Sequence, residues 1–518
     1  MATDDRFKTA KLSQESYPFT VEYTGEHEIR GLMYFQAWRP LYAENLSVQR
    51  SSLKVIVPAS LDIRFLEENM PAPAKVSMTD GKKIYFWTVD NLKTVEKQAY
   101  GPKFDELVPI VHLGPNDFEI DNRKGNASTW KEFGKFFYEL NDNRQKLPAS
   151  LAQKVRDLTA DKKSKEAKIR TLYQYMQDNT RYVSIQLGIG GWQTFTPEYV
   201  YENGYGDCKA LSNYMKSMLQ EVGIESHVAA VYAGANAADI KYTFPSSQFN
   251  HVILCVPNGQ DTVWLECTSS NLPSGYLSDF TEDRHVLLYT EEGGKLVKTP
   301  SSTPEQNLQF RQVAVRLKDN GNADVKTRVF ATGSQQDDFR RIDDEASEKE
   351  QEEFVQQRID AGSFDLIEYD FQEVPHAPAP GYQLSYEIQA TNWAKQSGSR
   401  IFLKPNVLGK LSVSVPKVDE RKQKIVLKAN FLDRDSVLYH LPEGYTIESK
   451  PELPLEIKSS FGYYKCDIQI PEAGSILYIR EMRMTKTELP ASEYETLRNF
   501  FRQLSKADNL QIVLSNRS

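Results

Sequence analysis

The stretch Gly204-Tyr205-Gly206-Asp207-Cys208-Lys209-Ala210-Leu211 decides how the centre of this chain is interpreted. One cysteine lies there between a glycine-rich turn and a run of apolar residues. At the first turn of a helix, the helix dipole and the free backbone N–H groups favour thiolate over thiol. The stretch therefore predicts the nucleophile of a thiol enzyme, with the Cys208 N–H as an oxyanion donor. The predicted helix ends near Gly223, and its apolar positions recur at three- and four-residue spacing: Leu211, Tyr214, Met215, Met218, Leu219 and Val222.

A thiol nucleophile needs a base, and the base needs an acceptor that orients it. His251 lies in a predicted strand, and the turn after it contains Asn258-Gly259, the favoured centre of a two-residue hairpin. If these two residues form the loop, His251 pairs with Glu266, with Cβ atoms about 4.5–5.5 Å apart. A carboxylate there would fix the tautomer of the imidazole and stabilise the imidazolium. The spacing thus predicts a triad of Cys208, His251 and Glu266, although a His–Glu pair across two strands can also be purely structural.

Other chemistries have weaker signals in the sequence. His227 stands at a strand start without a comparable partner, and His285 lies in a charged stretch. Gln193, in a glycine-rich loop, is a candidate second oxyanion donor. A zinc site is conceivable but lacks CxxC or HExxH spacing, so neither a metal nor a cofactor is expected. Its four ligands would be Cys208, His251, Cys255 and Cys267, of which the last two are expected to be small buried side chains and not a disulfide.

The composition excludes several classes of protein. At 518 residues the chain is too long for one hydrophobic core. The net charge is −8 with interspersed signs, so no nucleic-acid partner is expected. No apolar run is long enough to span a membrane. The N-terminus lacks the apolar segment of a signal peptide, which is expected either of a cytosolic protein or of a trimmed fragment of an exported one. Nothing in the pattern indicates an oligomeric state.

The pattern along the chain predicts a multidomain α+β protein. Residues 1–124 read as an antiparallel β-sandwich, and residues 125–304 as helices followed by an antiparallel sheet. Residues 305–518 read as a β-rich region that could comprise two subdomains split near 380–425. Its further expected features are an acidic helix from Glu345 to Ile359, a strand from Leu411 to Val415, and a final helix that starts at the capping box Ser492-x-x-Glu495.

Three motifs together resemble the transglutaminase-like core, a papain-related superfamily with a Cys-His-Asp triad. They are Gly206-Asp207-Cys208-Lys209 heading a helix, Asn250-His251-Val252 on a strand, and Trp264 to Thr268 on the next strand. The resemblance covers roughly residues 145–300. The superfamily usually has aspartate where this chain has Glu266, but glutamate can also accept the imidazole hydrogen bond. Asp207 is expected to cap the helix and not to take part in catalysis.

The regions on either side resemble those of multidomain bacterial proteins, frequent in Bacteroidetes, that carry this core between two β-rich domains of unknown function. The resemblance implies a cysteine hydrolase, a peptidase or amidase, that forms an acyl-thioester on a peptide or protein substrate. It also implies an extracytoplasmic location, periplasmic or secreted. Two alternatives stay open: a non-catalytic envelope binding or scaffold protein with a relic core, and an amine-transferring protein cross-linker.

Overall fold

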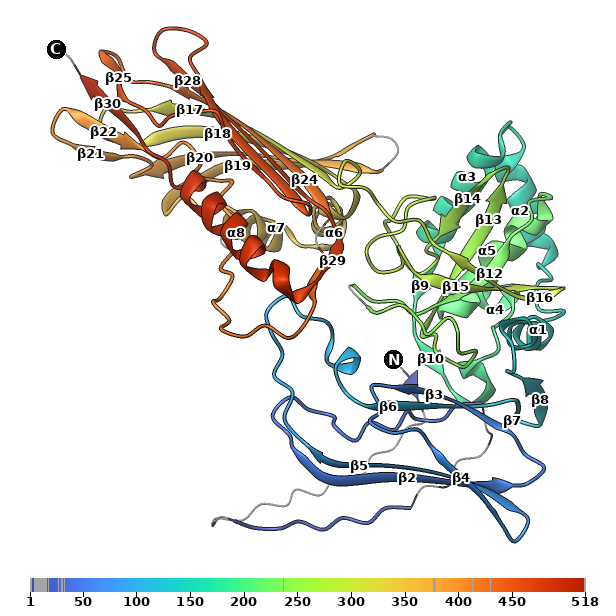
Figure 1. Cartoon of the computed structure of the whole chain (residues 1–518). Helices are drawn as coiled ribbons and strands as arrows, with labels where there is room; N and C mark the ends of the chain where they lie inside the picture. Colours follow the sequence, from blue (N-terminus) through green and yellow to red (C-terminus); the bar gives the residue numbers. More distant parts are fainter. Residues whose placement is uncertain are drawn as a thin grey trace. The chain divides into compact units, whose positions relative to one another are not determined.

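The computed structural model divides the chain into two compact units (Figure 1), Met1–Val95 with Asp105–Pro300, and Glu96–Phe104 with Ser301–Ser518. Within the described residues, no helix is both long and apolar enough to cross a membrane. The boundaries at 124/125 and 304/305 and the split near 380–425 stay predictions. The structure describes residues 2–3 and 16–516, with gaps at 17, 27, 29–30, 32, 236, 376–378, 412 and 429.

The N-terminal part of the first unit is a small two-layer β structure. Strands β2, β5 and β4 form one antiparallel sheet, and β3 pairs with β6. Alternate residues of β5 point inward, so that Trp87 packs edge-on against Phe65 of β3, with ring centroids 5.2 Å apart. The strands here are β1 (Ala2–Thr3), β2 (Val48–Pro58), β3 (Ile63–Glu68), β4 (Lys75–Thr79), β5 (Lys82–Leu92), β6 (Ile110–Pro115), β7 (Asp117–Ile120) and β8 (Arg123–Asn126).

The central part of this unit is a helical layer on an antiparallel sheet, as the sequence predicts for an α+β core. The sheet has five strands in the order β14-β13-β12-β15-β16. The apolar face of α5 is buried against β13, β14, α2 and α3. The helices are α1 (Trp130–Leu140), α2 (Ala149–Thr159), α3 (Lys165–Asn179), α4 (Pro197–Asn203) and α5 (Cys208–Glu221). The strands are β9 (Arg181–Tyr182), β10 (Ile185–Gln186), β11 (Tyr205–Gly206), β12 (His227–Val231), β13 (His251–Asn258), β14 (Asp261–Leu265), β15 (His285–Thr290) and β16 (Gly293–Lys298).

Two glycines let α1 lie directly on the sheet. A Cβ atom at Gly134 would be 2.2 Å from the Cα of Gly294 in β16, closer than any side chain tolerates. The aromatic face of α1 then packs against β15, where Phe137 stacks on Tyr289 with centroids 5.1 Å apart. This contact fixes α1 beside the end of the sheet that carries Tyr289.

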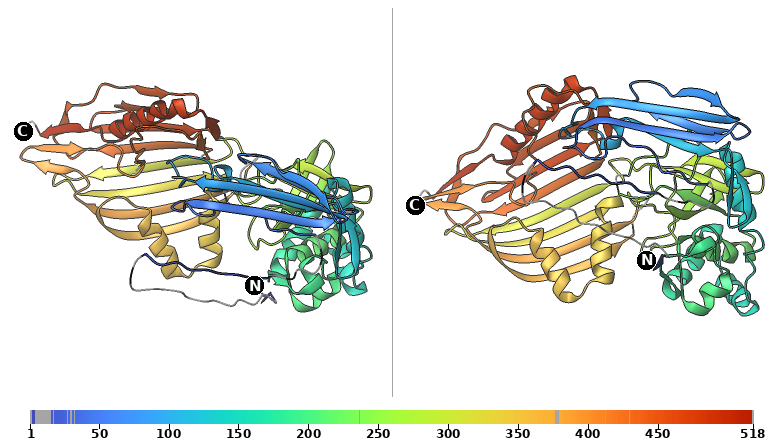
Figure 2. Two further views of the ribbon diagram at one scale, coloured as in Figure 1. Left: turned by 60° about the horizontal axis from the view of Figure 1, so that its bottom comes forward. Right: turned by 90° about the horizontal axis from the view of Figure 1, so that it is seen from below.

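The second unit is built on one eight-stranded sheet in the order β19-β20-β18-β17-β24-β28-β27-β26, in which β17 and β24 alone run parallel. Figure 2 shows α8 near one edge of this sheet and α6 and α7 near the other edge. The strands are β17 (Leu308–Leu317), β18 (Ala323–Thr332), β19 (Ser363–Val374), β20 (Gly381–Thr391), β24 (Phe431–His440), β26 (Leu455–Lys458), β27 (Gly462–Gln469) and β28 (Ser475–Met484). Smaller strands are β21 (Lys395–Ser397), β22 (Arg400–Leu403), β23 (Ile425–Leu427), β25 (Tyr445–Ser449), β29 (Thr487–Leu489) and β30 (Ile512–Asn516).

The acidic helix expected from Glu345 to Ile359 is confirmed as α7 (Glu348–Gln357), which starts at a capping box made by Ser347 and Glu350. A further helix, α6 (Asp337–Glu345), precedes it. Two other local predictions in this unit were wrong. Residues 411–415 form no strand among the described positions, since the Leu411 N–H donates to the carboxylate of Asp508. The last helix, α8 (Tyr494–Asp508), begins after a 3₁₀ turn with Glu493 as its N-cap, so the predicted box at Ser492 does not form.

Candidate active site

Cys208 is the first residue of α5, and the chain before it is tightly constrained. Gly204 ends α4 in the left-handed region with φ +67°, which glycine adopts without strain. Tyr205 and Gly206 then pair in parallel with β9. A Cys208 N–H at the first helical position has no acceptor within the helix, so it faces outward as a donor. The local structure therefore presents the thiol and its own N–H together.

Asp207 is the N-cap of α5, as the sequence predicts. Its Oδ1 accepts a hydrogen bond from the Ala210 N–H at 2.9 Å, and its Oδ2 lies 2.5 Å from Nζ of Lys209. The carboxylate is thus occupied by the helix end and by a neighbouring lysine. Asp207 fixes where the helix starts and so where the thiol lies.

The imidazole of His251 contacts the carboxylate of Glu266. Nε2 of His251 lies 2.9 Å from Oε1 and 3.1 Å from Oε2 of Glu266. The same carboxylate accepts a 2.6 Å hydrogen bond from the Thr268 hydroxyl. The hydroxyl of Tyr173 donates to the Glu266 backbone carbonyl at 2.8 Å. Glu266 is therefore held on both its side chain and its backbone.

The hairpin that carries these two residues differs from the predicted one. Asn258 pairs with Asp261 and Leu254 with Leu265, so the loop is Gly259-Gln260 and direct pairing of His251 with Glu266 was a wrong prediction. Gly259, with φ +66°, takes the left-handed position. Because side chains alternate with a period of two, a register shift of two residues leaves both side chains on the same face as diagonal neighbours, about 7–8 Å apart at the backbone. The longer side chain of glutamate suits this diagonal.

The side chain of Cys208 lies beside His251, close enough to help raise the pKa of the imidazole. Since Nε2 faces Glu266, Nδ1 is the ring nitrogen left for the sulfur. The three side chains are only 6 % (Cys208), 8 % (His251) and 4 % (Glu266) exposed. The structure thus brings the three predicted residues together in the order thiol, imidazole, carboxylate.

Charge in this group follows from burial and pairing. Burial disfavours the imidazolium, but attraction to Glu266 outweighs it, with hydrogen bonds to Cys208 and Glu266 adding, and the pKa of His251 is raised to about 10. Burial likewise disfavours the Glu266 carboxylate, yet His251 and the hydrogen bonds from His251 and Thr268 hold the pKa of Glu266 below its usual value. At neutral pH the pair is imidazolium and carboxylate.

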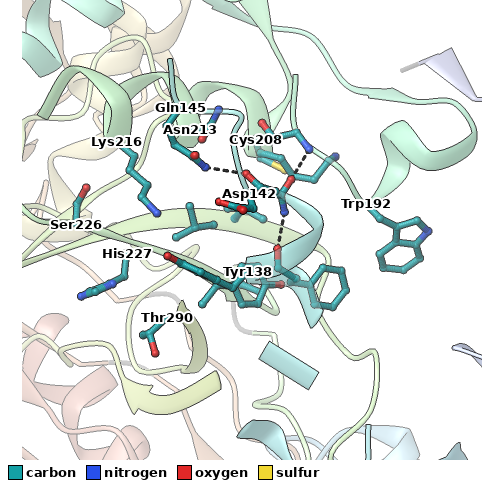
Figure 3. A pocket seen from close by; sticks show the side chains of 18 of the residues that line it. Tyr138, Asp142, Gln145, Trp192, Cys208, Asn213, Lys216, Ser226, His227 and Thr290 are labelled. Atoms are coloured by element: carbon teal, nitrogen blue, oxygen red, sulfur yellow. Dashed lines mark hydrogen bonds between the residues drawn. The ribbon is translucent and has the colours of Figure 1, made fainter. Parts of the chain in front are cut away.

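Cys208 and His251 lie in the wall of a cleft of about 1330 Å³. The cleft is lined by α1, α5, the inner strands of the sheet and the loop around Trp192 (Figure 3). Tyr289 also lines it, and burial together with the nearby Cys208 raises the pKa of Tyr289, which keeps its hydroxyl neutral. Glu266 is not among the lining residues, so His251 separates the carboxylate from the cleft.

Gln193 occupies the predicted loop but has other partners. Its side-chain N–H donates to the Leu140 carbonyl at 2.7 Å. The backbone N–H groups of Trp192 and Gln193 both donate to the Ile189 carbonyl. These bonds secure the loop against α1, and the role of Gln193 as an oxyanion donor stays a prediction.

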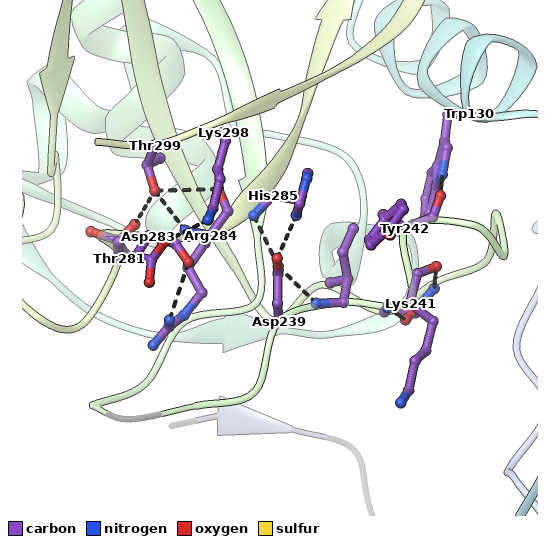
Figure 4. Close-up of polar contacts among 12 residues, drawn as sticks. Trp130, Asp239, Lys241, Tyr242, Thr281, Asp283, Arg284, His285, Lys298 and Thr299 are labelled. Atoms are coloured by element: carbon purple, nitrogen blue, oxygen red, sulfur yellow. Dashed lines mark hydrogen bonds and ion pairs between the residues drawn. The ribbon is translucent and has the colours of Figure 1, made fainter. Parts of the chain in front are cut away.

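The loop that leads into His251 is fixed at several points (Figure 4). The Asp239 carboxylate accepts hydrogen bonds from the backbone N–H of His285, at 2.9 Å, and from its Nδ1. Tyr242 stacks on the same imidazole, with centroids 5.0 Å apart. Next to His251, the amide of Asn250 bonds to both the N–H and the carbonyl of Ala233. His285 therefore anchors the loop and is not among the residues that line the cleft.

The structure also bears on Cys255, Cys267 and the alternative of a metal site. Cys255 and Cys267 are free and buried, as predicted, and burial raises the pKa of both thiols. Across the described residues no cluster of three or more His, Cys, Asp or Glu could hold a metal ion. No sequence pattern assigned a role to Thr268 or Tyr289. A threonine two residues after a carboxylate is a recognisable local signal, whereas Tyr289 comes from a distant strand.

Three stretches of the chain match known protein families. Residues 152–276 match the transglutaminase-like superfamily, residues 1–96 match the domain of unknown function DUF3857, and residues 399–514 match DUF3858. The chain is therefore a multidomain protein with a transglutaminase-like core flanked by two domains of unknown function.

Two solved structures resemble the chain. A "putative protease" from Parabacteroides distasonis has 16 % identity and a TM-score of 0.51, with 93 % of this chain and 76 % of that one covered, which shows a shared fold. A "putative cysteine protease" from Cytophaga hutchinsonii has 9 % identity and a TM-score of 0.22, with 46 % of this chain and 70 % of that one covered. No protein with a curated description matches.

Proposed function

We propose that the protein is a cysteine hydrolase, a peptidase or amidase, with Cys208 as nucleophile, His251 as acid and base, and Glu266 as the group that positions His251. The observation that carries the proposal is the position of the imidazole: its Nε2 contacts a buried carboxylate, and the ring lies beside the Cys208 side chain in the wall of a cleft. The imidazolium charge held by Glu266 would stabilise the thiolate beside it.

In the proposed reaction, the Cys208 thiolate attacks the carbonyl carbon of a peptide or amide bond. The resulting oxyanion accepts a hydrogen bond from the Cys208 N–H at the helix end. His251 passes its proton to the leaving nitrogen as the C–N bond breaks, which leaves an acyl-thioester on Cys208. His251, now neutral, takes a proton from water, the new C–O bond forms, and the C–S bond breaks to restore thiolate and imidazolium.

The substrate we propose is a peptide or protein, because the cleft is large, about 1330 Å³, and is lined by residues of α5 from Cys208 to Gln220. The extracytoplasmic location implied by the sequence resemblance is likewise a proposal.

The test incubates the full chain with a fluorogenic peptide library, and stops aliquots in acid for mass spectrometry of the intact protein. We expect cleavage by the wild type, an acyl adduct on Cys208, and neither in Cys208→Ala. Cys255→Ala is the matched control, since Cys255 is buried outside the cleft and should leave turnover unchanged. Addition of a primary amine distinguishes hydrolysis from amine transfer. If the amine is incorporated into the product, the protein is an amine-transferring cross-linker and not a hydrolase. Peptide binding without any adduct would overturn the proposal in favour of a scaffold.

A further inference from the structure

The cleft continues along α5 well beyond the thiol. Cys208, Asn213, Lys216 and Gln220 all line it from the same helix. At 1.5 Å rise per residue, Lys216 lies about 12 Å along the helix axis from Cys208. In Figure 3, Lys216, Ser226, His227 and Thr290 lie on one side of the pocket, away from Cys208 and Trp192. This distal end of the cleft has no part in the proposed bond cleavage.

Lys216 is a half-buried cation that lines the distal end of the cleft. Within the described part of the chain it forms no ion pair, and its Nζ lies over the ring of Tyr138, 5.8 Å from the centroid. Burial lowers the pKa of Lys216, and no neighbouring carboxylate offsets that effect. An ammonium withdrawn from water without an anion is unfavourable, whereas an anion from a ligand would restore the balance.

The groups around Lys216 are polar and incompletely satisfied. The Ser226 hydroxyl is buried and has no hydrogen-bond partner in the described structure. Burial lowers the pKa of His227 and outweighs the opposite effect of the Glu225 carboxylate, whose Oε1 is 3.4 Å from Nε2. This imidazole is therefore neutral unless the pH is low. Glu291 and Glu292 also line the cleft, but neither pairs with Lys216. A hydroxyl without a partner beside an unpaired cation suits an oxyanionic ligand.

We propose that this distal end of the cleft is a subsite for a carboxylate of the substrate, bound by Lys216. The proposal rests on the proposed function and adds a substrate class to it. An extended peptide rises about 3.3 Å per residue, so a span of about 12 Å places the carboxylate three to four residues from the scissile bond. The carboxylate could belong to an Asp or Glu side chain or to a free chain terminus.

The test measures binding and needs no turnover. Full-length Cys208→Ala is titrated with fluorescein-labelled alanine-rich octapeptide amides that carry one Glu or one Gln at each position in turn, and with the all-alanine peptide as free acid and as amide. We expect Glu at one or two adjacent positions, or the free acid, to bind about 10-fold more tightly than its neutral match. A side-chain preference and a terminal preference distinguish the two sources of the carboxylate.

The matched variants assign the preference to one lysine. Lys216→Met in the Cys208→Ala background should abolish it, and Lys216→Arg should keep most of it. Lys154→Met is the control, because Lys154 is exposed on α2, lies over Tyr175 in the same kind of contact, and is outside the cleft.

Three results would overturn the subsite: no peptide bound, no charge preference, or a preference that persists in Lys216→Met. A second measurement, iodoacetamide alkylation of Cys208 in a Lys216→Met variant that keeps the thiol, reports on the nucleophile itself. If the proposed function is wrong, Cys208 will not be unusually reactive in this measurement. If only the subsite is wrong, Cys208 will react as proposed and only the peptide-binding result will fail.

Discussion

Nε2 of His251 lies 2.9 Å and 3.1 Å from the two carboxylate oxygens of Glu266, and both side chains are buried. One ring N–H is thus shared between two acceptors, which fixes the plane of the imidazole. The other ring nitrogen, Nδ1, is left to face Cys208, whose side chain helps to raise the pKa of the imidazole. The geometry and the charge of this pair support the predictions below.

The first prediction concerns the proton on His251. With its pKa raised to about 10 from an ordinary value of 6.5, the folded protein holds this proton across the neutral range. In NMR titration we expect the His251 Cε1–H resonance to stay constant between pH 5 and pH 8. In Glu266→Gln, burial prevails and the resonance should report a neutral ring at pH 7. A wild-type resonance that titrates near pH 6.5 would contradict the ion pair.

The same linkage predicts how stability depends on pH. Because the folded pKa of His251 is above the unfolded one, the stabilisation is fully present below about pH 6.5 and is lost as pH rises toward 10. Urea denaturation at fixed pH values should show the wild type losing stability over this range, with a smaller loss in Glu266→Gln. Equal slopes in the two proteins would show that the proton on His251 does not depend on Glu266.

The third prediction concerns the reach of the carboxylate. Glu266 spans a diagonal of the hairpin, so Glu266→Asp should leave its carboxylate one methylene short of Nε2 and slow Cys208 alkylation by about 10-fold. Thr268→Val removes the 2.6 Å hydrogen bond to the carboxylate and should slow it by a few fold, while Thr268→Ser should restore it. If Thr268→Ser is as slow as Thr268→Val, the hydroxyl has no positioning role.

Thermal unfolding tests the cap that places the thiol. Asp207→Ala removes the hydrogen bond to the Ala210 N–H and the ion pair with Lys209, whereas Asp207→Asn removes only the ion pair. We therefore expect Asp207→Ala to be less stable than Asp207→Asn by about 1 kcal/mol, the usual value of an N-cap. Identical melting temperatures would show that the cap contributes nothing.

The region around Cys208 shows which features of the site could be predicted from the sequence and which could not. The periodicity after Cys208 located the helix and its start correctly, because an amphipathic pattern and a capping residue are local signals. The face shared by His251 and Glu266 also followed from period-two alternation, although the loop was misplaced by one residue. That error moved the register by two and so preserved the face.

Features that depend on tertiary contacts were not accessible from the sequence. The Leu411 N–H bonds to Asp508 almost a hundred residues away, so no local pattern could exclude the strand expected there. Lys216 and Tyr289 meet the cleft only because α5 packs on the sheet. Both looked like ordinary helix and strand residues.

The most direct test of the central claim is the rate of Cys208 alkylation by iodoacetamide between pH 5 and pH 9, read from the Cys208 peptide by mass spectrometry. An imidazolium held beside the sulfur predicts a rate nearly independent of pH from about 5.5 to 8. At pH 6 it should be at least about 10-fold faster than in His251→Ala. A wild-type rate that rises with pH as a free cysteine does, and equals that of His251→Ala throughout, would contradict the account.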